Sequence, residues 1–105
     1  MRRGEVCWAE LPQPIGRRPV LLLSRDAAYS VRTSVTLAII THTVRSIPVE
    51  VLLEPEDGMP TNCVVNLDAI LTIPKSRLTE RITTLSPEKM TAVGKAIVFA
   101  LDLRV

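Results

Sequence analysis

Two short segments carry the side chains best suited to chemistry on an anion. The first is Gly16-Arg17-Arg18-Pro19, which runs directly into the apolar stretch Val20–Leu23. A guanidinium keeps its charge and presents a planar fork of donors that matches phosphate oxygens. Pro19 is expected at the first position of a strand and biases Arg18 toward extended backbone. The segment is therefore either a phosphate clamp or a solvated basic turn.

The second segment is Thr41-His42-Thr43-Val44-Arg45, which follows the apolar run Leu37–Ile40. Successive strand residues point to opposite faces, so Thr41 and Thr43 are predicted to share one face while His42 points to the other. His42 is the only histidine, and beside Ser24 or Asp26 it would suggest a nucleophile and its base. No sequence context for an activated serine surrounds Ser24, so a surface or partly buried histidine is the competing interpretation.

Composition limits the kind of protein that positions these residues. A chain of 105 residues that is 47% hydrophobic, with a net charge of +2, predicts a single folded domain over residues 1–105 and excludes disorder. The aromatic residues are only Trp8, Tyr29 and Phe99, too few for binding single strands mainly by stacking. Cys7 and Cys63 form no metal-ligand pattern, which predicts buried thiols and no metal site. With no apolar leader or membrane-spanning run, we expect a cytoplasmic protein without membrane contact.

The hydrophobic pattern predicts short strands followed by one helix. The predicted strands are Glu5–Leu11, Pro19–Ser24, Val35–Thr43, Pro48–Leu53, Cys63–Val65 and Ala69–Ile73. Within the fourth of these, Glu50 is expected to face water. A turn is expected at Pro55–Gly58.

The last element is predicted to be a helix that packs on the strands. Ser86-Pro87-Glu88 combines an N-cap hydroxyl, a proline at the first helical position and an acidic residue near the positive helix end. The predicted core-facing residues recur at helical spacing: Met90, Val93, Ile97 and Leu101, widened by Val98 and Phe99. Together the elements predict a mainly β fold, a small barrel closed by a C-terminal helix.

Longer stretches of the sequence resemble the MazF/PemK family. Residues 3–11 (Arg-Gly-Glu-Val-Cys-Trp-Ala-Glu-Leu) and 18–24 (Arg-Pro-Val-Leu-Leu-Leu-Ser) match the family's opening, and the similarity continues through residues 48–51, 67–73 and 75–82. The resemblance implies an SH3-like β-barrel that forms a homodimer. It also implies a toxin endoribonuclease of a type II toxin–antitoxin system. Such an enzyme cuts single-stranded RNA at short sequence motifs without a metal or cofactor, and its cognate antitoxin blocks the site.

The resemblance carries the family's catalytic arginine onto Arg18 and its catalytic threonine onto Thr41, seven residues before Pro48. The implied reaction is attack by the RNA 2′-hydroxyl, which leaves a 2′,3′-cyclic phosphate and a 5′-hydroxyl. Donors aimed at the phosphate stabilise the charge that develops there. The resemblance gives the arginine an acid–base role, but arginine stays protonated in proteins, so the sequence does not identify the general base. His42 is a candidate contributor because imidazole exchanges protons readily, although its strand parity argues against it. Residues expected to position the RNA are Gln13, Gly16, Arg17, Ser24, His42, Thr43, Arg45 and Asp68.

Departures from the family pattern affect the substrate. The loop Leu11–Gly16 is short and stiffened by prolines, so relaxed gating of the substrate or a different cleavage motif is expected. Ala69 stands where relatives often carry glutamine, and Cys7 where they carry a further aromatic residue, and both differences bear on substrate preference. One alternative is a gyrase-poisoning toxin of the CcdB type, which relies on a C-terminal aromatic contact, whereas this chain ends in Asp102-Leu103-Arg104-Val105. The other is a barrel that binds an antitoxin or nucleic acid without catalysis, against which the presence of both Arg18 and Thr41 argues.

Overall fold

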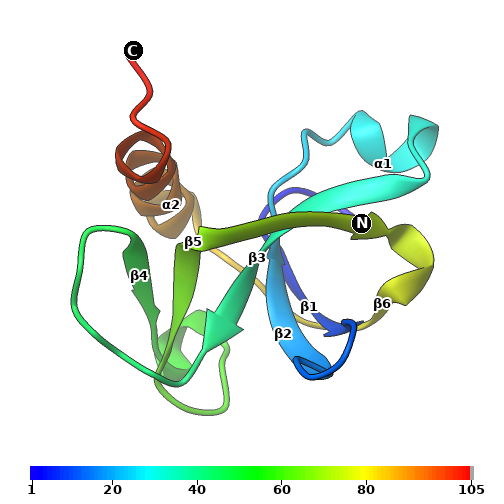
Figure 1. Cartoon of the computed structure of the whole chain (residues 1–105). Coiled ribbons are helices and arrows are strands. Elements are labelled where there is room, and N and C mark those ends of the chain that lie inside the picture. Colours follow the sequence, from blue (N-terminus) through cyan, green and yellow to red (C-terminus); the bar gives the residue numbers. More distant parts are fainter. Residues whose placement is uncertain (105) are drawn as a thin grey trace.

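One antiparallel sheet runs through most of the chain and sets the shape of the molecule (Figure 1). The computed structural model describes residues 1–104. In chain order its elements are β1 (Glu5–Glu10), β2 (Arg17–Leu22), α1 (Ala28–Val31), β3 (Ser34–Thr41), β4 (Glu50–Leu53), β5 (Cys63–Pro74), β6 (Leu78–Thr84) and α2 (Pro87–Ala100), with 3₁₀ turns at Pro55–Asp57 and Lys75–Arg77. The six strands lie in the order β4-β5-β3-β2-β1-β6 and curl into a half-barrel with α2 on one side. The predicted mainly β barrel with a C-terminal helix is confirmed.

The two edges of the curled sheet approach each other through the segment that follows β4. The hydroxyl of Thr83 on β6 donates a hydrogen bond of 3.0 Å to the backbone oxygen of Asp57. Gly58 comes next with φ of 94°, and a Cβ at that position would collide with the side chain of Thr83. Glycine tolerates this backbone conformation and this close approach. The loop between β4 and β5 is thereby held against β6.

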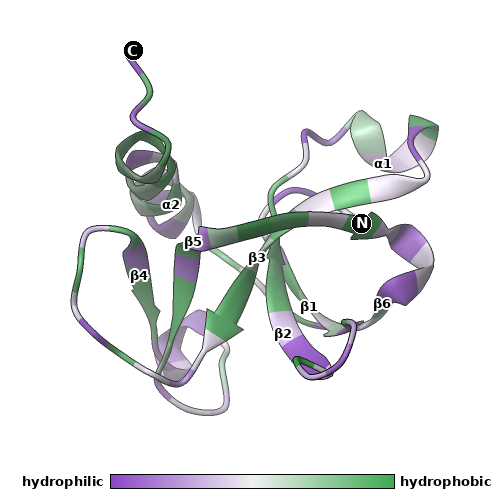
Figure 2. Ribbon diagram, in the orientation of Figure 1, coloured by the Kyte–Doolittle hydropathy of each residue, from purple (hydrophilic) through white to green (hydrophobic). Residues whose placement is uncertain are grey.

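The core lies on both sides of the central strand β2. Val20, Leu21 and Leu22 are all fully buried, as predicted for a strand covered on both faces. Alternate residues belong to two clusters, because Leu21 packs with Val93 and Ala96 of α2 whereas Val20 and Leu22 pack with Tyr29 of α1. Figure 2 shows the apolar residues concentrated along the strands that cross the middle of the molecule. Cys7 and Cys63 are free and buried, as the sequence predicts.

Helix α2 begins where the sequence predicts but buries a different face near its end. Ser86 caps it, its hydroxyl accepting a hydrogen bond of 3.2 Å from the backbone N–H of Lys89. The fully buried residues are Val93 and Ala96. The prediction for Phe99 and Leu101 is wrong, since they are 60% and 56% exposed. The helix ends at Ala100, and Phe99 lies on the flank of its buried face, lining an open pocket with Pro48 and Leu52.

Three further strand predictions need correction. The two segments predicted between residues 63 and 73 form one continuous strand, β5, whose pairing with β3 shifts register between Ala38 and Ile39. Strand β6 is not predicted, because most of its residues are polar and exposed. Strand β2 starts at Arg17, two residues before Pro19. The proline is tolerated inside the strand because β2 pairs with β3 only from Val20 onward.

Candidate active site

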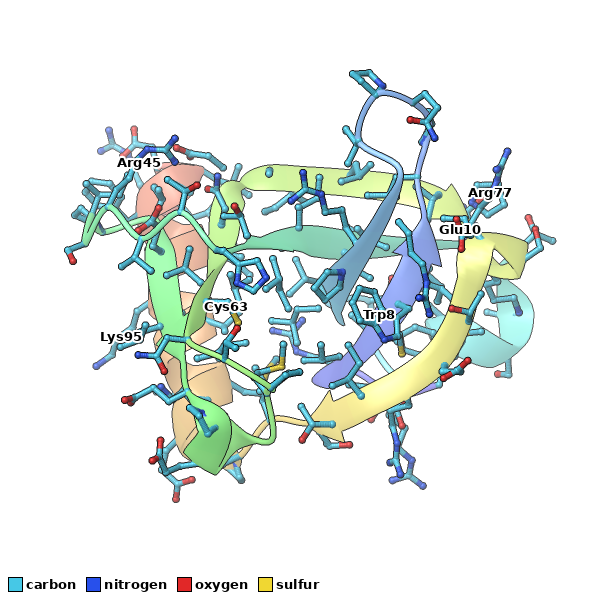
Figure 3. The ribbon with its side chains drawn as sticks, turned by 90° about the horizontal axis from the view of Figure 1, so that it is seen from below. Trp8, Glu10, Arg45, Cys63, Arg77 and Lys95 are labelled. Carbon is cyan, nitrogen blue, oxygen red and sulfur yellow. The ribbon has the colours of Figure 1, made fainter. Side chains whose placement is uncertain are left out.

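A cavity of about 600 Å³ opens at the end of the half-barrel where β1 and β3 finish and β2 begins. Residues from β1, β2, β3, β5 and β6 and from the β1–β2, β3–β4 and β4–β5 loops line it: Trp8, Ile15, Arg17, Arg18, Pro19, Ile40, Thr41, His42, Met59, Pro60, Thr61, Cys63 and Ile82. In Figure 3, Trp8 and Cys63 lie on the inner side of the curled sheet, whereas Arg45 and Lys95 lie at its outer margin. The cavity therefore combines an apolar wall with a small set of polar groups, as small-ligand and active sites do.

The pairing of β2 with β3 explains why Arg18 and Thr41 meet in this cavity. Val20 lies opposite Ile39 in the antiparallel register. Arg18 and Thr41 lie two residues beyond this last pair, and because side chains alternate along a strand they belong to the same face as Val20 and Ile39. Both side chains are half-buried. Residues separated by more than twenty positions in the sequence thus face one space.

The charge of Arg18 is available to a ligand. Within residues 1–104, no carboxylate lies within 4.0 Å of its guanidinium, whereas the neighbouring Arg17 is engaged by other groups. The Arg17 guanidinium carbon lies 4.4 Å from the ring centroid of Trp8, and its Nε lies 3.7 Å from a carboxylate oxygen of Glu10. Stacking and ion pairing of this kind fix the direction of a guanidinium. The side chain of Arg17 is therefore held at the rim of the cavity, and Arg18 presents an unpaired positive charge inside it.

The hydroxyl of Thr41 is oriented by its own loop. Its Oγ1 accepts a hydrogen bond of 3.3 Å from the backbone N–H of Thr43. Because the oxygen is occupied as an acceptor on that side, the hydroxyl proton is left to be donated elsewhere. Thr41 can therefore donate to an anion that Arg18 also binds.

The prediction that His42 points away from Thr41 is wrong, since both residues line the cavity. Strand β3 ends at Thr41 and the backbone bends at His42, so the alternation of a strand does not extend to the imidazole. His42 is exposed, and its Nδ1 lies 3.5 Å from the hydroxyl oxygen of Thr61. The β4–β5 loop thus contributes a polar partner to the histidine.

The prediction for Glu50 is also wrong, because its side chain is only 2% exposed. One carboxylate oxygen accepts backbone hydrogen bonds from Arg45 and Ser46, at 2.9 and 3.0 Å. Ser46 has φ of 56°, a conformation that non-glycine residues seldom adopt. Glu50 therefore holds the turn that carries the chain away from Thr41, and Arg45, 3.9 Å from the same carboxylate, is directed toward it.

The other residues predicted to position RNA do not line the cavity, and each has a distinct place. Gln13 and Gly16 lie in the β1–β2 loop, from which Ile15 reaches the cavity instead. The Ser24 hydroxyl accepts the backbone N–H of Thr36 at 2.8 Å, a structural role beside α1. Thr43, Arg45 and Asp68 are exposed outside the lining.

The side of the cavity formed by the β4–β5 loop and β6 was not predicted from the sequence. Four residues meet there because the loop is held against β6: Met59, Pro60, Thr61 and Ile82. No local sequence pattern predicts this contact. Cys63 also lines this side, and burial, followed by the negative charge of Asp57, raises the pKa of its thiol. At neutral pH it is therefore an uncharged, weakly polar part of the wall.

No group of three or more His, Cys, Asp or Glu side chains among residues 1–104 is placed to hold a metal ion. In the same part of the chain, no helix has the length and apolar character needed to cross a bilayer. The polar groups of the cavity remain the site on which chemistry can be argued.

Comparison with known sequences assigns residues 2–101 to the family described as PemK-like, MazF-like toxin of type II toxin–antitoxin system. A probable endoribonuclease MazF5 of Mycobacterium tuberculosis is 41% identical over 101 residues, covering 95% of this chain and 92% of that protein. An endoribonuclease MazF of Staphylococcus saprophyticus is 33% identical over 112 residues, covering 98% of this chain and 92% of the relative. The similarity thus spans nearly the full length of both chains.

Solved structures show the same architecture. The Mycobacterium tuberculosis toxin MazF-mt6 superimposes with a TM-score of 0.89 at 35% identity, covering 96% of this chain and 99% of that one. An endoribonuclease in complex with its cognate antitoxin, from a mycobacterial species, gives a TM-score of 0.88 at 28% identity, covering 100% and 98%. The half-barrel and its C-terminal helix are therefore shared with these proteins.

Proposed function

The chain belongs to the PemK-like, MazF-like toxins of type II toxin–antitoxin systems and is an endoribonuclease, and we propose that it cleaves single-stranded RNA at a short sequence motif without a metal ion. The observation that carries this proposal is the meeting of Arg18 and Thr41 in one cavity. A permanent cation and a neutral hydroxyl donor, aimed at one phosphodiester, supply what phosphoryl chemistry needs from a protein.

The proposed reaction begins with the 2′-hydroxyl of the RNA as nucleophile. Its oxygen forms a bond to the adjacent phosphorus, its proton leaves, and the bond from phosphorus to the 5′-oxygen breaks as that oxygen gains a proton. The products are a 2′,3′-cyclic phosphate and a 5′-hydroxyl. Arg18 binds the charged non-bridging oxygens, and Thr41 donates its hydroxyl proton to one of them, which its hydrogen bond from Thr43 leaves free.

The rim of the cavity would hold the nucleotides beside the scissile phosphate. Arg17 and Trp8 present a stacked cation and ring, on which a splayed base can lie. We assign looser roles along the RNA path to the predicted residues outside the lining, which are Gln13, Gly16, Ser24, Thr43, Arg45 and Asp68. With Trp8 as the only aromatic residue lining the cavity among residues 1–104, hydrogen bonds would carry most of the sequence discrimination.

The partners follow from the family. We propose that the chain acts in the cytoplasm as a homodimer and that a cognate antitoxin blocks its cavity. A structural relative at 28% identity has been solved with its cognate antitoxin. An antitoxin segment that carries carboxylates would form an ion pair with the guanidinium of Arg18. It would thereby occupy the position that an RNA phosphate takes in the substrate complex.

The test is cleavage of a defined RNA by the purified chain in excess EDTA. We expect cuts at one short motif, with mass spectrometry finding a 2′,3′-cyclic phosphate and a 5′-hydroxyl. Replacing the ribose at the cleaved position with 2′-deoxyribose should abolish cutting, because the nucleophile is then absent. Inertness in EDTA with activity restored by Mg²⁺, or cleavage of the 2′-deoxy substrate, would contradict the proposal.

A further inference from the structure

Cleavage by a 2′-hydroxyl requires a proton acceptor, and the cavity offers few. Within the described chain, no aspartate or glutamate lines it. Arg17 and Arg18 stay protonated at any physiological pH, so neither accepts a proton. The hydroxyl of Thr41 is a neutral donor with little basicity. The remaining groups with proton chemistry are the thiol of Cys63 and the imidazole of His42.

These two groups differ in accessibility. Cys63 is buried in the wall of the cavity, 2% exposed, and burial raises the pKa of its thiol. It therefore presents little thiolate and little surface to a substrate. His42 is exposed at the mouth of the same cavity, one residue after Thr41. A general base must accept a proton and release it again, and an imidazole side chain can do both.

We propose that His42 is the general base of this ribonuclease and that Thr61 is the positioning residue that orients its ring. The inference rests on the proposed function and identifies the group that removes the proton from the 2′-hydroxyl. It depends on the bend after β3, which turns His42 into the cavity, and on the β4–β5 loop, which brings Thr61 to it.

The contact with Thr61 favours the imidazole tautomer that carries its proton on Nδ1 and can accept a proton at Nε2. The hydroxyl oxygen of Thr61 lies 3.5 Å from Nδ1 of His42. When Nδ1 carries the proton and donates it to this oxygen, Nε2 has a free lone pair. A long contact at a catalytic base can shorten when substrate binds, because such hydrogen bonds tighten in the reacting complex. Nε2 is then the atom that faces the substrate.

With His42 as the base, every proton transferred in the reaction has a donor and an acceptor. Nε2 of neutral His42 takes the proton of the 2′-hydroxyl as the bond from O2′ to phosphorus forms, and His42 becomes an imidazolium. Arg18 and Thr41 stabilise the charge on the non-bridging oxygens. The bond from phosphorus to O5′ then breaks, and O5′ takes a proton from solvent at the open mouth. His42 returns its extra proton to water, so no other reactant is consumed.

Among the charged and titratable groups that line the cavity, only His42 is expected to make kcat depend on pH near neutrality. They are Arg17 and Arg18 on β2 and Cys63 on β5, while β1, β6 and the β4–β5 loop contribute no ionisable side chain among the described residues of the lining. The arginines do not titrate in the useful range, and the raised pKa of Cys63 moves its thiol further above neutrality. Because a general base acts only in its unprotonated form, we expect kcat to rise with pH and then to level off.

The experiment compares the wild-type chain with His42→Gln on one short RNA under saturating conditions. Glutamine keeps hydrogen-bonding capacity but has no proton to exchange in this range. We expect kcat to fall by ~10²–10⁴, the usual contribution of a general base, and the acidic limb of the pH profile to disappear. Binding of the same RNA with a 2′-O-methyl group at the cleaved position should change less than threefold. Thermal unfolding should match wild type, since the residue is exposed.

A second substrate separates a base from an acid. RNA with sulfur in place of the 5′-bridging oxygen has a leaving group that departs without a proton. If His42 is the base, His42→Gln remains slow on this substrate; if the defect vanishes, His42 is an acid and the assignment is overturned. Thr61→Val should lower kcat about tenfold and keep the pH limb, and Thr61→Ser should restore the rate. Wild-type kcat and pH profile in His42→Gln would overturn the inference, whereas a wild-type chain inert on RNA would overturn the proposed function itself.

Discussion

Replacing Thr41 with valine removes the hydroxyl that we propose donates to the scissile phosphate. The two side chains have nearly the same shape, so the lost group is the hydroxyl alone. Its oxygen accepts only the N–H of the exposed Thr43 among the described residues, and water can replace that partner. We therefore expect Thr41→Val to change the free energy of unfolding by less than about 1 kcal/mol. A lost donor to a developing oxyanion commonly costs ~10²–10³ in rate, which is the fall in kcat that we expect here.

The assay is single-turnover cleavage of a short RNA by each variant, with urea unfolding measured in parallel. Thr41→Ser is the matched control, because it keeps the hydroxyl and loses only a methyl group, and it should stay within tenfold of wild type. If Thr41→Val cleaves at the wild-type rate, the hydroxyl does not act on the phosphate. If both variants are equally slow, the loss of the hydroxyl alone does not account for the effect, because Thr41→Ser keeps that group. Either result would refute the role given to Thr41.

Three further predictions concern the fold and the buried groups. Ser86→Ala should lower the free energy of unfolding in urea by about 1 kcal/mol, because it removes the cap of α2; no change would show that the cap contributes nothing. Burial raises the pKa of Tyr29, the only tyrosine, to about 12, so absorbance at 295 nm should titrate near pH 12 when folded and near pH 10 in urea. The associated stability is complete below pH 10 and lost as pH rises through 12, and a folded midpoint near 10 would contradict this. Cys63 should react slowly with iodoacetamide at pH 7.5 until urea exposes it, given its raised pKa.

Local patterns were enough to predict most of the fold. The continuous apolar run in β2 indicated burial on both faces, and Val20 and Leu21 are fully buried. The cap at Ser86 fixed the start of α2. Predictions failed where distant contacts decide the outcome. Strand β6 forms because it pairs with the edge of β1, and Phe99 is exposed because it lies on the flank of α2 beside β4 and not on the face that carries Val93 and Ala96. Neither fact is present in a short window of sequence.

The residues of the candidate site likewise fall into those predicted from the sequence and those brought to the site by distant contacts. The resemblance identified Arg18 and Thr41, and the register of β2 and β3 explains their meeting. The orientation of His42 depends on where β3 ends, which alternation alone does not specify. Thr61 and Ile82 reach the cavity only because the β4–β5 loop is held against β6. Glu50 is buried because its carboxylate accepts two backbone N–H groups, a role that an alternating strand pattern does not predict.

The most direct test of the account is the rate at which Arg18→Ala cleaves RNA in EDTA. Arg18 is half-buried and, within residues 1–104, forms no ion pair, so its removal should leave the folded state intact. The account predicts wild-type thermal unfolding together with a loss of cleavage of at least ~10², and expression of the variant should no longer slow growth. Cleavage at the wild-type rate by folded Arg18→Ala would contradict the central claim that this guanidinium and Thr41 act on one phosphodiester.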